Sequence, residues 1–182
     1  MLWSKIVLLG STRKSLNHER QKTVAGIKMM SLGGSMRQKY AVKQLSIFLE
    51  NRKGRLLEVT GTLKDAGINI RALALAESAE FGILRLVVNN PEKAKSALSS
   101  EGFTVNDQDV FAVEVEDSPG SFHEVVKILA LEDINIDYTY AFVGNSNKAV
   151  LVFKVPDELL EKALEALDKG GIKIVEPLFF YD

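Results

Sequence analysis

The sequence predicts an α+β protein made of two consecutive copies of a β-α-β-β-α-β unit. The main observation is an internal repeat, in which residues 45–70 recur within residues 110–136 at a single offset of 66 positions. The second observation is that each copy changes from period-two to helical hydrophobic spacing in the same order. Identical pairs in this span, found without a gap, include Gly54/Gly120, Glu58/Glu124, Val59/Val125, Leu63/Leu129, Ile68/Ile134, Asn69/Asn135 and Ile70/Ile136.

Composition and charge exclude several classes of function. The 182 residues suit one large or two small domains, and the net charge of −1 gives no basic field for nucleic acid. The chain has no cysteine and only two histidines, which excludes disulfides, thiolate metal sites and a multi-histidine metal site. No apolar run reaches the roughly 20 residues of a membrane span. We therefore expect a cytoplasmic protein without a metal, a cofactor or a membrane partner.

Residues 1–38 differ from the rest of the chain. Residues 1–35 mix charge, glycine and serine without a sustained period. Codons for Gly33 and Gly34 can also form a ribosome-binding sequence, and Met36 follows them directly. We expect this N-terminal extension to be disordered or to result from a start codon assigned too early.

The first copy should begin with a strand whose one face carries Leu45, Ile47 and Leu49. Its helix carries Leu56, Val59 and Leu63 on one side. A hairpin, a second helix opened by proline, and a fourth strand complete the unit. The expected ranges are strand 41–50, turn 51–54, helix 55–66, strands 69–78 and 81–89, helix 91–102 and strand 103–109.

The second copy follows without a linker, since its first strand continues directly from the fourth strand of the first copy. Tyr138, Tyr140 and Phe142 share one face of its second strand. The expected ranges are strand 110–116, turn 117–120, helix 121–131, strands 136–143 and 149–155, a helix from 156 to 169 and a closing strand 172–180.

This order of elements is the ferredoxin-like arrangement. We expect two such domains, packed side by side into one sheet with all helices on one face. Placing the two second strands next to each other would set Ala72, Ala74 and Ala76 against the aromatic face of the other copy. The opposite face of the sheet would expose a large apolar patch, which soluble monomers rarely tolerate, so we expect a homodimer.

The turn and strand-start motifs resemble those of the ACT domain. The residues concerned are Asn51-Arg-Lys-Gly54 with Ile68-Asn-Ile70, and Asp117-Ser-Pro-Gly120 with Ile134-Asn-Ile136. The first copy departs from the usual pattern, because Lys53 stands where proline is common. More narrowly, the chain is similar to small prokaryotic tandem ACT proteins without a catalytic domain. The implied domains are residues 39–109 and 110–182.

The resemblance implies a non-catalytic regulatory protein that binds a small ligand, most often a free amino acid, at an interface between ACT units. It also allows a regulatory subunit of an amino-acid metabolic enzyme. The alternative is a module that mediates assembly and binds no ligand.

The residues support a ligand site at the first glycine turn. A helix start leaves backbone N–H groups unpaired and carries positive dipole charge, which suits a carboxylate. Arg52, Lys53 and Arg55 flank this turn, whereas no base flanks the second turn. An ammonium group would need acceptors such as Asn51 and Asn69. The candidate ligand-binding residues are Asn51, Lys53, Gly54, Arg55, Leu56, Asn69, Asp117 and Gly120.

Structural roles compete with these assignments. The glycines can serve only the turns, the bases can be a solvated loop, and the aromatic face of the second copy can be packing. An RNA-recognition domain shares the element order, but the strand at residues 81–87 lacks the aromatic signature of that fold. A metal-carrying relative would need a thiol pair. No nucleophile or acid/base pair marks an enzyme.

Overall fold

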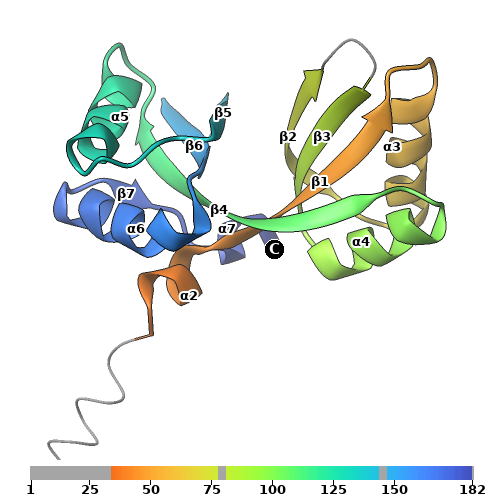
Figure 1. Ribbon diagram of the computed structural model, residues 1–182, viewed down its shortest axis with the longest axis horizontal. Coiled ribbons are helices and arrows are strands. Elements are labelled where there is room, and N and C mark those ends of the chain that lie inside the picture. Colours follow the sequence, from red (N-terminus) through yellow and green to blue (C-terminus); the bar gives the residue numbers. More distant parts are fainter. Residues whose placement is uncertain (1–33, 78–80, 144–146, 182) are drawn as a thin grey trace, which may run out of the picture. The chain divides into compact units, whose positions relative to one another are not determined.

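The computed structural model describes residues 34–77, 81–143 and 147–181, and residues 36–182 form one compact unit. Each repeat forms a domain with helices on one face of its strands (Figure 1). The expected extension at residues 1–38 lies outside the described part except for its last residues, which belong to a short helix. The elements are α2 (Met36–Tyr40), β1 (Val42–Glu50), α3 (Arg55–Asp65), β2 (Ile70–Glu77), β3 (Phe81–Val88), α4 (Pro91–Ser100), β4 (Val105–Glu116), α5 (Ser121–Leu131), β5 (Tyr138–Val143), β6 (Lys148–Lys154), η1 (Asp157–Leu159), α6 (Leu160–Lys169), β7 (Lys173–Ile174) and α7 (Leu178–Tyr181).

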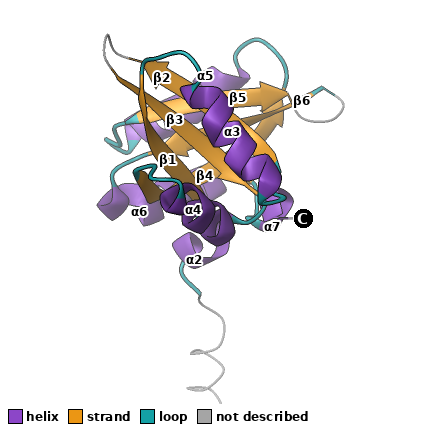
Figure 2. Cartoon of the chain, turned by 90° about the vertical axis from the view of Figure 1, so that its right-hand side faces the viewer, coloured by secondary structure: helices purple, strands orange, loops and turns teal. Residues whose placement is uncertain are grey.

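The first domain packs α3 and α4 across one face of its strands (Figure 2). The alternating residues Leu45, Ile47 and Leu49 of β1 point to these helices and are buried against Val59 and Leu63 of α3. This is the core that the period-two and helical patterns predict. Asn90 caps α4, because its side chain accepts a hydrogen bond from the backbone N–H of Lys93 at 3.0 Å.

Strand β4 belongs to both domains. Residues 105–110 pair with β1, whereas residues 111–116 pair with β6 and, near Val113, with β7. The prediction that the fourth strand runs directly into the fifth is confirmed. Since one strand serves both copies, the described strands form a seven-stranded antiparallel sheet in the order β2-β3-β1-β4-β6-β5, with β7 beside β4.

The two domains form one sheet with the helices on one face, as predicted, but the junction differs from the expected one. The second strands of the two copies, β2 and β5, lie at opposite ends of the strand order and do not pair with each other. The reason is covalent continuity: β4 is both the last strand of the first copy and the first strand of the second, so the two copies are joined through it without a loop.

The faces opposite α3, α4, α5 and α6, called here the inner faces, pack against each other at their base. Gln44 on β1 is fully buried there. Its Nε2 donates to the hydroxyl of Tyr138 at 2.7 Å, and its Oε1 accepts from the hydroxyl of Tyr140 at 2.9 Å. The buried apolar members of this contact are Val42, Ala72, Val87, Val110, Ala112, Val150, Val152, Val175 and Phe180.

This packing buries part of the apolar sheet surface that was expected to be exposed. Each inner face is partly covered by the other domain of the same chain, a contact that the sequence did not predict. The small residue Ala72 and the large Tyr140 and Phe142 do belong to one apolar cluster, but this cluster lies between the two faces and not along a shared edge. Phe48, Phe81 and Ile83, on the outer part of the first inner face, stay exposed.

The expected closing strand at residues 172–180 is wrong in most of its length. Only residues 173–174 pair with β4, and a short helix, α7, follows from residue 178. Pro177 lacks the N–H that a continued ladder requires. Phe180 is fully buried between the inner faces, and its carbonyl accepts a hydrogen bond from Arg71 Nε at 3.1 Å. Burial of Phe180 between the two domains therefore determines the conformation of this segment.

Helix α2 is attached to the second domain. The backbone N–H groups of Met36 and Arg37 donate to the carboxylate of Glu161 at 2.7 and 2.8 Å. Arg37 also pairs with Asp109 on β4, at 2.5 Å, and Lys43 contacts the same carboxylate at 2.8 Å. Burial alone would raise the pKa of Asp109, but the hydrogen bonds from Lys43 and Arg37 outweigh it, and the pKa is lowered.

Among the described residues, no helix is both long and apolar enough to cross a bilayer.

Candidate functional site

The turns that precede α3 and α5 are two copies of one backbone structure. Gly54 has φ 93° and ψ −20°, and Gly120 has φ 95° and ψ −18°. Such left-handed conformations favour glycine, because a Cβ would approach the following carbonyl. No side chain caps either helix start. Both turns therefore present a helix N-terminus, and only their side chains distinguish them.

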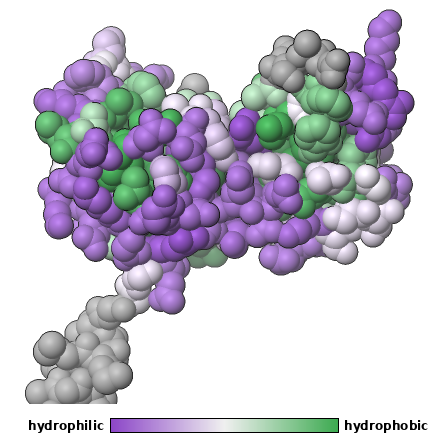
Figure 3. Space-filling model, in the orientation of Figure 1, coloured by the Kyte–Doolittle hydropathy of each residue, from purple (hydrophilic) through white to green (hydrophobic). Residues whose placement is uncertain are grey.

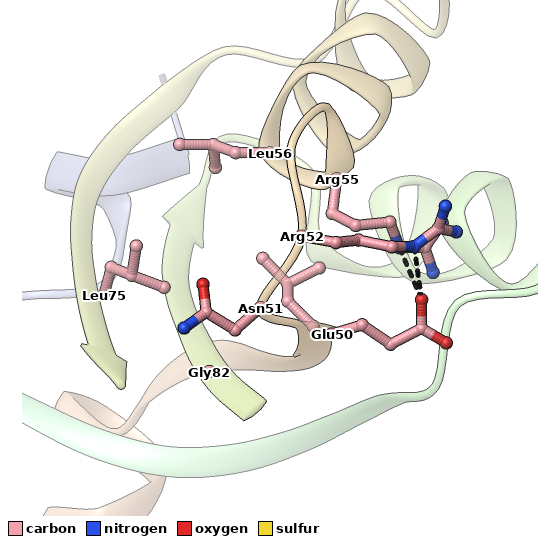
Figure 4. A pocket seen from close by; sticks show the side chains of 8 residues that line it. Glu50, Asn51, Arg52, Arg55, Leu56, Leu75 and Gly82 are labelled. Atoms are coloured by element: carbon pink, nitrogen blue, oxygen red, sulfur yellow. Dashed lines mark hydrogen bonds and ion pairs between the residues drawn. The ribbon is translucent and has the colours of Figure 1, made fainter. Parts of the chain in front are cut away.

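A pocket of about 110 Å³ lies beside the first turn (Figure 4). It is bounded by the end of β1, the turn, the first residue pair of α3, and strands β2 and β3. The register of the sheet explains part of this lining, because Gly82 lies directly opposite Leu49. The lining residues are Leu49, Glu50, Asn51, Arg52, Arg55, Leu56, Leu75 and Gly82.

The charged residues of the pocket are already paired with one another. Arg52 Nε donates to Glu50 Oε2 at 2.6 Å, and Arg55 Nε lies 3.7 Å from the same oxygen. Arg55 also pairs with Glu58, and its guanidinium carbon lies 4.6 Å from the ring centroid of Phe103. With a side chain only 18% exposed, Arg55 is held in place more firmly than Arg52, which is 60% exposed.

The other side of the pocket is apolar. Figure 4 shows Leu56 and Leu75 on this side together with the amide of Asn51, whereas Arg52, Arg55 and Glu50 are gathered on the opposite side. Leu56 is 46% exposed and Leu75 is 49% exposed. The pocket thus combines both signs of charge at one end with aliphatic surface at the other.

The structure brings together only some of the residues that the sequence suggested. Asn51, Arg55 and Leu56 line the pocket, and Lys53 and Gly54 belong to the turn beside it. Asn69 lies beyond the opposite end of α3, where its backbone N–H donates to Asn89 at 2.9 Å. Asp117 and Gly120 belong to the other domain and lie outside the lining of this pocket.

Four lining residues were not foreseen: Leu49, Glu50, Leu75 and Gly82. Glu50 directly precedes the turn motif, so its position next to Arg52 could have drawn attention to it. Leu75 and Gly82 reach the pocket only through strand pairing, which a turn motif cannot reveal.

The second turn has a different environment. At the repeat offset, Arg52 and Arg55 correspond to Ser118 and Ser121, whose hydroxyl oxygens lie 2.9 Å apart. Glu116, which corresponds to Glu50, pairs with Lys148. The two helix starts therefore share a backbone but only the first carries arginines.

Comparison with known proteins supports the resemblance seen in the sequence. Residues 40–176 match a family described as an ACT domain pair. The crystal structure of protein BT0572 from Bacteroides thetaiotaomicron is similar, with a TM-score of 0.74 and 39% identity over 79% of this chain and 98% of that one. A search of the curated proteins found no match.

A more distant structural neighbour is the ligand-free regulatory subunit of aspartate kinase from Thermus thermophilus. Its TM-score is 0.54, at 16% identity, over 70% of this chain and 90% of that one. At this level of identity the similarity establishes a shared fold.

Proposed function

Because the chain belongs to the ACT domain pair family, we propose that it is a non-catalytic regulatory protein that binds a free amino acid at an interface between ACT units. The observation that carries the proposal is the pocket beside Gly54. It places a helix start, two arginines, a glutamate and aliphatic side chains around one small volume.

The charges of the pocket complement a zwitterion. The ligand carboxylate would accept hydrogen bonds from the backbone N–H groups at the start of α3, with Arg55 adding charge. The ligand ammonium would lie near Glu50, with the side-chain carbonyl of Asn51 as a second acceptor. Glu50 and the arginines pair with each other in the free protein. In the complex, the ligand ammonium would pair with Glu50 and the ligand carboxylate with Arg55.

The apolar end favours an aliphatic side chain on this amino acid. Leu49, Leu56 and Leu75 line that end, and Gly82 brings no side chain to it. Burial of aliphatic surface contributes about 25 cal/mol per Å². A charged ligand side chain would lose hydration there without gaining a partner, so we expect valine, leucine or isoleucine to bind better than aspartate or lysine.

A second ACT unit would complete the site. Strand β2 is an edge of the described sheet, and Leu56 and Leu75 are about half exposed beside it. Figure 3 shows apolar surface over β2 and β3. An edge strand flanked by apolar side chains invites pairing with another chain. We therefore expect a homodimer in which the partner lies along β2 and closes the pocket.

The test is a thermal-shift screen with the twenty amino acids. A ligand at a hundredfold excess over its dissociation constant stabilises the folded state by about 2.7 kcal/mol. For a chain of this size that is a shift of roughly 5–10 °C. Arg55→Ala should weaken binding about tenfold, because it removes a charge-assisted contact. No shift with any amino acid at millimolar concentration would contradict ligand binding.

The second candidate function is a ligand-free assembly module or a regulatory subunit of an amino-acid metabolic enzyme. The favouring observation is that Leu57 and Leu73, next to the pocket on α3 and β2, are also strongly exposed. Apolar surface of this kind marks protein contacts. A negative amino-acid screen together with a stable complex with such an enzyme would favour this function.

A further inference from the structure

A partly buried arginine lies between the two inner faces, away from the pocket described above. Arg85 is on β3, with Ser46 of β1 and Ala74 of β2 beside it in the sheet. Its guanidinium carbon lies 4.0 Å from the ring centroid of Tyr138, which belongs to the other domain. Arg85 therefore bridges the two domains through a cation–π contact.

Among the described arginines, Arg85 has neither an ion pair nor a hydrogen bond to a carbonyl group. Its Nε is inaccessible to solvent and has no hydrogen-bond partner among the described residues. Among the described residues, no ion pair joins the Arg85 guanidinium to a carboxylate. A buried donor without an acceptor costs about 1–3 kcal/mol. By contrast, Arg37 pairs with Asp109, Arg52 with Glu50, Arg55 with Glu58, and Arg71 with the carbonyl of Phe180.

A second donor lies at the other end of the Tyr138 side chain. The hydroxyls of Tyr138 and Ser46 both donate to Gln108 Oε1, each at 3.1 Å. These two bonds fix the orientation of the Gln108 amide and leave its N–H groups without a partner within the described residues. Arg85 and Gln108 thus both offer donors around one aromatic ring.

The surface next to Arg85 is apolar. Ile83 on β3 and Phe48 on β1 follow on the same face, and they are 38% and 46% exposed. Phe48 also packs on Phe81, with 4.8 Å between the ring centroids. In Figure 3 the surface is notched between the two domains. A cation without a counter-ion therefore borders an exposed aromatic and aliphatic wall.

We propose that a small monocarboxylate with an aromatic or aliphatic group binds between the inner faces. Its carboxylate lies on the guanidinium of Arg85 and the amide N–H of Gln108, and its apolar group lies on Phe48 and Ile83. A planar guanidinium matches a carboxylate in a two-point arrangement. No ammonium acceptor is needed, which distinguishes this ligand from the amino acid proposed above.

This site is independent of the pocket beside Gly54. That pocket opens between α3 and β2, whereas Arg85 lies on the inner face of the first domain. A ligand on Arg85 would also touch Tyr138, so it would favour the packed arrangement of the two domains. Binding at one site can therefore fail without affecting the other.

The experiment uses benzoate as the probe and benzamide as its neutral match. Nuclear magnetic resonance of the full chain labelled with ¹⁵N-arginine follows the Nε–H signal of Arg85. We expect benzoate to shift this signal and benzamide to leave it unchanged. Arg85→Gln should weaken benzoate binding by about tenfold or more, because it removes a charge-assisted hydrogen bond.

Two controls separate the outcomes. Gly54→Ala should leave benzoate binding unchanged, and Arg85→Lys, which keeps the charge but not the fork, should weaken it less than Arg85→Gln. The proposal is overturned if millimolar benzoate does not shift the Arg85 signal of the wild type. It is also overturned if benzamide binds equally well, since the patch would then recognise only an apolar ring.

Discussion

The buried contact of Gln44 with two tyrosines gives a sharp prediction about what holds the domains together. Gln44→Leu keeps a side chain of similar size but removes hydrogen bonds of 2.7 Å to Tyr138 and 2.9 Å from Tyr140. Tyr138 keeps an acceptor, because its hydroxyl also donates to Gln108 at 3.1 Å. Tyr140 loses the acceptor that the structure gives it.

The expected loss of stability follows from these contacts. Each hydrogen bond contributes about 1 kcal/mol, and an unsatisfied buried hydroxyl costs about 1–3 kcal/mol. Burial of Tyr140 is deep enough to raise its pKa. We expect Gln44→Leu to lower the free energy of unfolding by about 2–4 kcal/mol, measured as a lower midpoint in urea with an unchanged slope.

The double variant tests the reason for this loss. If an orphaned hydroxyl causes it, Tyr140→Phe in the Gln44→Leu background should recover about 1 kcal/mol or more, because both polar partners are then replaced by apolar groups. In the wild-type background the same Tyr140→Phe change should destabilise. A neutral Gln44→Leu variant, or losses that simply add in the double variant, would refute the reasoning.

Three further predictions concern the turn, the ion pairs of β4 and the assembly. Gly54→Ala and Gly120→Ala should each cost about 1–2 kcal/mol by chemical denaturation, since their φ angles are 93° and 95°, but only Gly54→Ala should weaken amino-acid binding in calorimetry. Asp109→Asn should destabilise by about 2 kcal/mol at pH 7, because its pKa is lowered in the folded state. This difference between wild type and variant should be complete above the unfolded pKa of about 3.9 and disappear as the pH falls through the folded pKa, in denaturation curves at several pH values. Leu75→Glu should convert a dimer to a monomer in light scattering, whereas Leu131→Glu, at a still more exposed leucine on α5, should not; a dimer that survives Leu75→Glu would place the interface elsewhere.

The sequence predicts the fold well where local patterns and the repeat agree. The alternation of Leu45, Ile47 and Leu49 and the helical spacing of Val59 and Leu63 identify the face that each element buries. The repeat then transfers the same arrangement to the second copy. These are short-range signals, and the structure confirms them.

The closing segment shows where such signals fail. Residues 172–180 are apolar enough to suggest a strand, yet only Lys173 and Ile174 pair with β4, and Pro177 has no N–H with which the ladder could continue. Phe180 then finds its burial between the inner faces. A period-two pattern cannot tell burial within one sheet from burial between two domains.

The pocket shows the same limit. The turn motif identifies Asn51, Arg55 and Leu56, which are neighbours in sequence. Leu75 and Gly82 depend on the register of a hairpin against β1. Strand register is determined by long-range pairing, so a single turn cannot predict which side chains complete its pocket.

The shared strand also limits how a ligand could act. Strand β4 pairs with β1 through one half and with β6 through the other, so a rotation between the domains would break ladder hydrogen bonds in one of them. The fully buried Gln44 and its tyrosine partners add to this cost. The pocket beside Gly54, in contrast, borders the free edge at β2. We therefore expect an amino acid bound there to act on the partner chain along β2. The angle between the two domains of one chain should stay unchanged. Equal inter-domain distances in the free and the bound protein, measured by electron paramagnetic resonance between labels on α4 and α6, would support this; a ligand-dependent change would show that β4 can bend.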